Sequence, residues 1–120
     1  MRHRIVIFIL FFIVGCIPKT ALKGFDSSAW KNDANGCNGM RKVLVDEIIN
    51  RKDELVGLGQ EDIFNTLGKP NRHELYSRHK KAFVYVINGS ADCLTNGVKE
   101  EKLVIRFDAL ERTKEVILYK

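Results

Sequence analysis

The stretch AFVYVIN, residues 82–88, decides the fold class of this chain. Its aromatic and β-branched residues favour extended backbone over helix. Side chains alternate between the two faces of a strand. One face then carries Phe83, Tyr85 and Ile87, and the other carries Val84 and Val86. The segment is therefore predicted to be a strand of an antiparallel sheet.

The same period of two recurs in three segments around this stretch. They are residues 73–77 (HELYS), 102–107 (KLVIRF) and 114–119 (KEVILY). Turns are predicted at 78–81 and 108–111, and a polar loop at 89–100, because polar and basic residues gather there. The second half of the chain is therefore predicted to be a meander of three or four strands.

Helical spacing dominates the residues before these strands. In residues 40–55, apolar side chains recur with near-helical period, which predicts one buried stripe. The stripe consists of Met40, Leu44, Ile48 and Leu55, is widened by Val43 and Ile49, and excludes Arg41. Residues 60–67 predict a second helix, which buries Ile63, Phe64 and Leu67 and is stopped by Pro70.

These elements predict an α+β fold, with two N-terminal helices packed on one face of a three- to four-stranded antiparallel sheet. That arrangement is the economical way to bury the apolar stripes of both helices. A chain of this length forms one small domain, which we assign to residues 38–120.

The N-terminus has the features of a signal peptide. A basic start, Met1–Arg4, precedes ten apolar residues, 5–14, which as a helix are too short to cross a bilayer. The junction Ile13-Val14-Gly15-Cys16 resembles the lipobox of bacterial lipoproteins. That resemblance implies cleavage before Cys16, with a diacylglycerol on its thiol and an acyl chain on its new amine.

Residues 1–15 are accordingly interpreted as a signal peptide, and residues 16–37 as lipid anchor and tether. An ordinary secreted protein and an uncleaved membrane anchor are the alternatives. Phe25 and Trp30 lie in the polar, turn-rich part of the tether, where they either plug the edge of the core or bind a partner.

Lipidation of Cys16 would leave only Cys37 and Cys93, in a compartment that permits disulfides. We predict that these two cysteines form a structural disulfide. Metal ligation and a redox pair are the competing interpretations, although no CxxC motif occurs and no histidine lies near either cysteine in the sequence.

Composition and motifs argue against catalysis and nucleic-acid binding. Removing residues 1–15 leaves 18 Lys and Arg against 15 Asp and Glu, a net charge of +3 with both signs intermixed. No nucleophile motif, phosphate loop or dinucleotide fingerprint is present. His73 and His79 match no common metal-ligand spacing. We expect a non-enzyme without cofactor, metal or small-molecule substrate.

The string LGQEDIFNTLGKP, residues 58–70, resembles the helix-ending pattern of the SmpA/OmlA (BamE-like) family of small outer-membrane lipoproteins. The matching positions are Gly59, Ile63, Leu67, Gly68 and Pro70. β-Lactamase inhibitor protein repeats share the same type of helix–helix–sheet unit. The chain departs from the BamE-like pattern at Gln60, where a Ser or Thr cap is usual, and in its cysteine pair. Residues 25–37 instead resemble uncharacterised lipoproteins of Bacteroidetes-type bacteria.

The resemblance implies a lipid-anchored envelope scaffold or adaptor, on the periplasmic side of the outer membrane, that docks on another envelope protein. Its docking surface would be the sheet face that the helices leave free. Candidate surface residues are Trp30, Tyr76, Val84 and Val86. The alternative is an inhibitor-type or ligand-binding module with a concave aromatic surface. That surface would be formed by Trp30, Tyr76, Phe83 and Tyr85.

Overall fold

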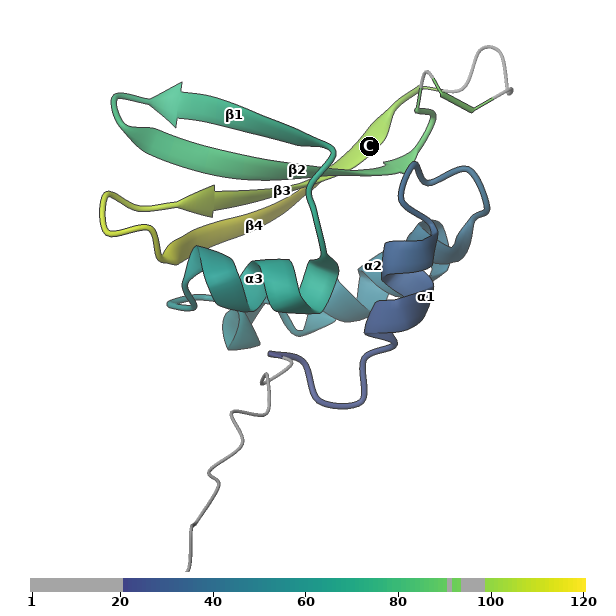
Figure 1. Ribbon diagram of the computed structural model, residues 1–120, viewed down its shortest axis with the longest axis horizontal. Coiled ribbons are helices and arrows are strands. Elements are labelled where there is room, and N and C mark those ends of the chain that lie inside the picture. Colours follow the sequence, from purple (N-terminus) through teal and green to yellow (C-terminus); the bar gives the residue numbers. More distant parts are fainter. Residues whose placement is uncertain (1–20, 91, 94–98) are drawn as a thin grey trace, which may run out of the picture.

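The computed structural model describes residues 21–90, 92–93 and 99–120 (Figure 1). Four strands form one antiparallel sheet in the order β1-β2-β3-β4. They are β1 (Arg72–Ser77), β2 (Lys80–Asn88), β3 (Glu101–Phe107) and β4 (Thr113–Tyr119). Each strand lies where alternation predicted it, within one or two residues at its ends.

The helices cover one face of this sheet and leave the other free of any described helix (Figure 1). They are α1 (Ser27–Asn32), α2 (Met40–Asn50), α3 (Gln60–Leu67) and a single 3-10 turn, η1 (Lys52–Glu54). The predicted α+β class is confirmed. Three α-helices pack on the four-stranded sheet, whereas the sequence predicted two.

The main core lies between the helices and the inner face of the sheet. Phe83, Tyr85 and Ile87 of β2 point into it, as the alternation predicted. The helices contribute Val45, Ile48, Ile63 and Leu67, and β3 contributes Leu103, Ile105 and Phe107. Phe83 packs edge-on against Phe107, with the ring centroids 4.7 Å apart.

The N-terminal segment is part of this core, which corrects the domain boundary. Leu22, Phe25 and Trp30 all belong to the same buried cluster, so residues 22–37 are not a tether and the folded domain begins before residue 38. Asp26 caps α1 by accepting a hydrogen bond from the amide of Ala29 at 3.1 Å. That cap allows six residues, 27–32, to form a helix that carries Trp30 into the interior.

The buried faces of the longer helices also differ from the prediction. Val43 is 71% exposed and Met40 is 40% exposed, whereas α2 buries Arg41 with Val45 and Ile48. The stripe is rotated because α1 and the N-terminal segment pack against α2 as well as the sheet does.

Helix α3 shows the same effect. Phe64 is 49% exposed, whereas Thr66 is buried together with Ile63 and Leu67. The Thr66 hydroxyl accepts a hydrogen bond from the amide of Ala21 and donates one to the carbonyl of Asp62, both at 2.9 Å. A threonine is therefore tolerated inside because both hydrogen-bonding functions of its hydroxyl are satisfied.

Arg41 is the largest charged side chain in the interior, at 1% exposure. Its Nε donates to the carbonyl of Trp30 at 3.1 Å. Its Nη1 donates to Oδ1 of Asn71 at 2.8 Å and to the carbonyl of Val86 at 3.2 Å. One side chain thus connects α1, α2, the segment before β1 and the end of β2.

The surroundings of the guanidinium are aromatic and acidic. Its Cζ lies 4.9 Å from the ring centroid of Trp30 and 5.7 Å from that of Tyr85, within cation–π range. Burial lowers the pKa of Arg41, and the nearby carboxylate of Asp33 opposes that lowering. Asp33 also accepts the backbone amide of Arg41 at 3.0 Å, so it fixes the start of α2.

Cys37 and Cys93 form a disulfide, as predicted. It joins the turn before α2 to the segment after β2. The two segments approach closely next to it, since a Cβ on Gly36 would lie only 2.6 Å from the carbonyl oxygen of Ile87. A cross-link over a sequence separation of 56 residues stabilises a fold by about 4 kcal/mol if the chain-entropy account holds.

Arg41 predicts a large loss of stability on substitution. Arg41→Met should lower the free energy of unfolding by about 3 kcal/mol, because it removes three hydrogen bonds to acceptors on three different segments of the fold. Urea denaturation of the variant measures this change. The matched control is Lys42→Met, since the neighbouring side chain is 57% exposed and should change stability little. Equal stability of the two variants would contradict the role given to Arg41.

Candidate functional site

The outer face of the sheet has a small apolar floor. It is formed by Ala82 and Val84 of β2 and Val104 of β3, which are buried although no described helix covers them. Val84 lies opposite Val104 in the ladder, and Ala82 lies opposite Arg106. Long side chains from neighbouring positions therefore lean over the small ones and shield them from water.

Polar and aromatic side chains form a rim around this floor. Together they enclose a hollow of about 270 Å³, which we call the outer hollow. It is lined by Glu74, Tyr76, Ala82, Lys102, Val104, Arg106 and Tyr119. All four strands contribute to it, so it exists only when the complete sheet is assembled.

Arg106 organises the rim. Its Nη1 lies 3.3 Å from Oε2 of Glu115, and its Nη2 donates to the hydroxyl of Tyr119 at 3.1 Å. Its Cζ lies 5.1 Å from the ring centroid of Tyr76, which packs on the floor. The Nε of Arg106 is buried and has no hydrogen-bond partner among the described residues. The guanidinium is thus held from two sides and keeps one donor unsatisfied.

The tyrosines are oriented as firmly as the arginine. Tyr76 donates its hydroxyl to the carbonyl of Phe107, across the sheet from its own strand. The ammonium of Lys102 lies 5.7 Å from the ring centroid of Tyr119, on the next strand. These contacts place two aromatic rings at fixed positions on either side of the floor.

Charges of both signs border the outer hollow. Nη2 of Arg72 lies 2.7 Å from a carboxylate oxygen of Glu100, and Nε of Arg72 lies 3.6 Å from Glu74. The hydrogen bond from Arg72 lowers the pKa of Glu100, so this carboxylate is ionised at neutral pH. Because these pairs are partly exposed to water, they contribute little to stability and remain available to a partner.

The arrangement is suited to recognition. Tyrosine and arginine around a buried apolar centre are the composition of the energetically important part of protein–protein interfaces. The outer hollow can accept an apolar side chain on its floor, while Arg106 and Lys102 meet a carboxylate or carbonyl of the same partner.

Only some of the residues predicted for the docking surface lie on the outer face of the sheet. Tyr76 is on the outer face, as predicted. Val84 and Val86 occupy the same face of β2 but are buried, so they offer little contact area. Trp30 is not a surface residue: it is fully buried, which agrees with the interpretation that it plugs the core, and its Nε1 donates to the carbonyl of Leu67 at 3.0 Å.

The alternative aromatic surface is also not formed. Phe83 and Tyr85 lie under the helices with Trp30, on the inner face of the sheet. Tyr85 donates to the carbonyl of Gly68 at 2.8 Å, and burial raises the pKa of its hydroxyl. Three of the four rings assigned to an exposed concave surface are therefore core residues.

Sequence reasoning missed Lys102, Arg106 and Tyr119. The available signal was the alternation itself, since Lys102, Val104 and Arg106 occupy one face of β3. The ladder register that brings Tyr119 opposite Lys102 cannot be obtained from a single strand.

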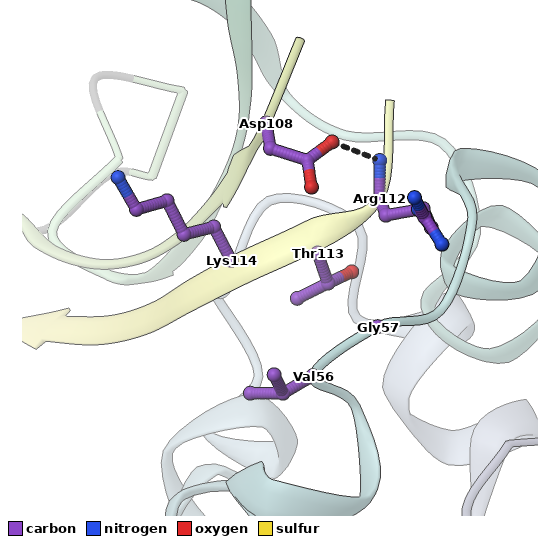
Figure 2. A pocket seen from close by; sticks show the side chains of 6 residues that line it. All are labelled: Val56, Gly57, Asp108, Arg112, Thr113 and Lys114. Atoms are coloured by element: carbon purple, nitrogen blue, oxygen red, sulfur yellow. Dashed lines mark hydrogen bonds between the residues drawn. The ribbon is translucent and has the colours of Figure 1, made fainter. Parts of the chain in front are cut away.

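A second hollow, of about 460 Å³, lies beside the start of β4 (Figure 2). Its lining consists of Val56, Gly57, Asp108, Arg112, Thr113 and Lys114. Asp108 accepts the amides of Leu110 and Arg112 at 2.9 and 3.1 Å, and the latter hydrogen bond lowers its pKa. Figure 2 shows the side chains of Arg112 and Lys114 extending in opposite directions. The carboxylate of Asp108 therefore stabilises the β3–β4 turn. The cationic groups of Arg112 and Lys114 do not converge on a common point.

Cys16 and the predicted signal peptide lie outside the described residues. Within the described part, no helix is long and apolar enough to span a membrane, and no group of three or more His, Cys, Asp or Glu side chains could hold a metal ion. His73 packs edge-on against Phe83, with ring centroids 5.0 Å apart.

No protein-family model, curated protein or solved structure matches the chain.

The partly exposed position of Arg106 predicts that its replacement changes the stability of the fold only slightly. Arg106→Met should lower the free energy of unfolding by less than about 1 kcal/mol, because its ion pair with Glu115 is partly exposed. The same substitution at Arg41 should cost several times more, so urea denaturation of the two variants compares a surface arginine with a core arginine. A loss at Arg106 as large as that at Arg41 would show that the rim is a structural feature.

Proposed function

We propose that this chain is a lipid-anchored, non-enzymatic adaptor of the bacterial envelope, which docks on another membrane protein through the outer hollow. The proposal includes an outer-membrane location facing the periplasm and a role in outer-membrane assembly like that of the SmpA/OmlA (BamE-like) family. The observation that carries it is the outer face of the sheet, where Tyr76, Arg106 and Tyr119 surround an apolar floor.

The lipid anchor is supported by the order of features at the N-terminus. The basic start, the ten apolar residues 5–14 and the Gly15-Cys16 junction follow one another as in lipoprotein signals. Each buried methylene contributes about 0.8 kcal/mol to membrane binding, so one acyl chain binds marginally and several bind stably. A lipidated Cys16 would hold the domain at the membrane permanently.

The BamE-like role is supported by the local structure of the matching string. Helix α3 lies between Gly59 and Gly68, and the chain then passes through Pro70 into β1, as the resemblance implies. Gly68 has a φ of 76°, a conformation that favours glycine, and it ends the helix where the family pattern places its Leu-Gly pair. The alternative inhibitor module has lost the aromatic surface that it required.

Lipidation is tested by replacing the acceptor. Cells that produce the full chain should incorporate a palmitate analogue into the protein, and Cys16→Ser should abolish that label, because the thioether needs the thiol. Cys37→Ser is the control, since that sulfur belongs to the disulfide and should keep the label. Labelling of the Cys16→Ser protein at the normal level would rule out the anchor.

Docking is tested by site-specific photocrosslinking in intact cells. A crosslinking amino acid in place of Tyr119, at the rim, should capture a membrane protein of the envelope. The same amino acid in place of Val43, which is 71% exposed on the helical side, should not capture it. Arg106→Met should reduce the yield from position 119 because it removes the main polar anchor of the rim. Equal capture from both positions would contradict docking through this face.

A further inference from the structure

We infer that the helical side of the domain faces the lipid surface and that the outer hollow points away from the bilayer. This inference rests on the proposed anchor at Cys16. It follows from where the chain joins the folded domain and from how few residues separate that place from Cys16.

The first described residues are firmly attached to the helices. The amide of Ala21 donates to the hydroxyl of Thr66 on α3 at 2.9 Å, and Leu22 is fully buried. The carbonyl of Lys23, the next residue, accepts a hydrogen bond of 2.9 Å from Nη1 of Arg51, which directly follows α2. The position of Ala21 is thus fixed by its own hydrogen bond to α3, and by the packing of Leu22 and the hydrogen bond to Lys23 that follow it.

This attachment lies on the side of the helices that is turned away from the sheet. Figure 1 shows the dark blue segment that begins at residue 21 running along the lower side of the helical layer, with the sheet above the helices. The helices therefore separate Ala21 from the outer hollow. Any path from Ala21 to the outer hollow must pass around the edge of both layers.

The chain between Cys16 and Ala21 is too short for that path. It contains five Cα–Cα steps, which reach at most about 18 Å when fully extended. A helix with its side chains is about 10–12 Å thick, and a sheet layer adds about 10 Å. The direct thickness is therefore already about 20 Å, and the way around the edge is longer. With the acyl chains of Cys16 in the bilayer, the outer face cannot lie on the headgroups.

Charge does not compete with this geometry. Near the attachment, Arg51 pairs with Glu47 at 3.1 Å and with Glu54 at 2.6 Å, while Lys23 is exposed. Opposite charges thus largely balance around the attachment. The orientation should consequently depend on the length of the tether, and change little with salt or with the fraction of anionic lipid.

The orientation restricts the partner. The outer hollow would open toward the aqueous compartment, separated from the headgroups by the thickness of the domain, about 20 Å. The surface that docks on Tyr76, Arg106 and Tyr119 must then belong to a water-exposed portion of the partner. A transmembrane segment of the partner cannot reach it.

The test uses the full chain, produced in bacteria, purified with its lipid and reconstituted in vesicles whose headgroups carry a short-range fluorescence quencher. An introduced cysteine is the only free thiol, because Cys37 and Cys93 are bonded to each other and Cys16 is acylated in the proposal. A fluorophore at Lys23→Cys should lose most of its emission. The same fluorophore at Glu74→Cys, on the outer face, should keep most of it at low and high salt.

A lengthened tether is the matched variant. Inserting about ten Gly and Ser residues between Thr20 and Ala21 adds flexible chain. It should increase the quenching at Glu74→Cys and reduce the difference between the two labels. Unchanged quenching in the lengthened protein would show that something other than tether length orients the domain.

Two failures can be told apart by the intact mass of the purified protein. If Cys16 carries no acyl group and the protein does not bind the vesicles, both the anchor and the orientation are rejected. If the protein is acylated and bound, but the label at Glu74→Cys is quenched as strongly as that at Lys23→Cys, the orientation is overturned and the anchor remains.

Discussion

The guanidinium of Arg41 is the interaction on which the packing of this domain depends. It donates to the carbonyl of Trp30 at the end of α1 and to the carbonyl of Val86 in β2, and the amide oxygen of Asn71 accepts it before β1. A buried charge is tolerated only where hydrogen bonds compensate for lost hydration. The elements that supply these acceptors must therefore be in place together, which makes α1 and the N-terminal segment part of the fold.

The asymmetry between the two faces of the sheet follows from this packing. The helices cover the inner face, so the aromatic rings of that face are buried in the core together with Trp30. The outer face has no described helix above it and relies on its own long side chains. Arg106 and Tyr119 shield Val104 and its neighbours, and the same side chains create a surface with the composition of an interface.

The attachment of Ala21 relates the proposed anchor to the direction in which the outer hollow opens. The chain joins the domain on the helical side, so a lipid on Cys16 would direct the outer hollow into the aqueous space. A rigid disulfide-bonded domain on a short tether would then present one face to partners at a defined distance from the membrane. This arrangement suits an adaptor, because the tether restricts both the position and the direction of docking.

The amino-acid sequence by itself determined the strand segments, the two faces of β2 and helix α3, because alternation and helix-stopping residues are local properties. The pairing of Cys37 with Cys93 was predicted by assigning Cys16 to the lipid anchor, which leaves two cysteines. Only the tertiary structure decided that Arg41 and Thr66 are buried while Val43 and Phe64 are exposed. It also decided that Arg106 meets Tyr119 in the outer hollow. These outcomes depend on ladder register and on contacts between distant segments, which satisfy polar groups that the sequence pattern would leave in water.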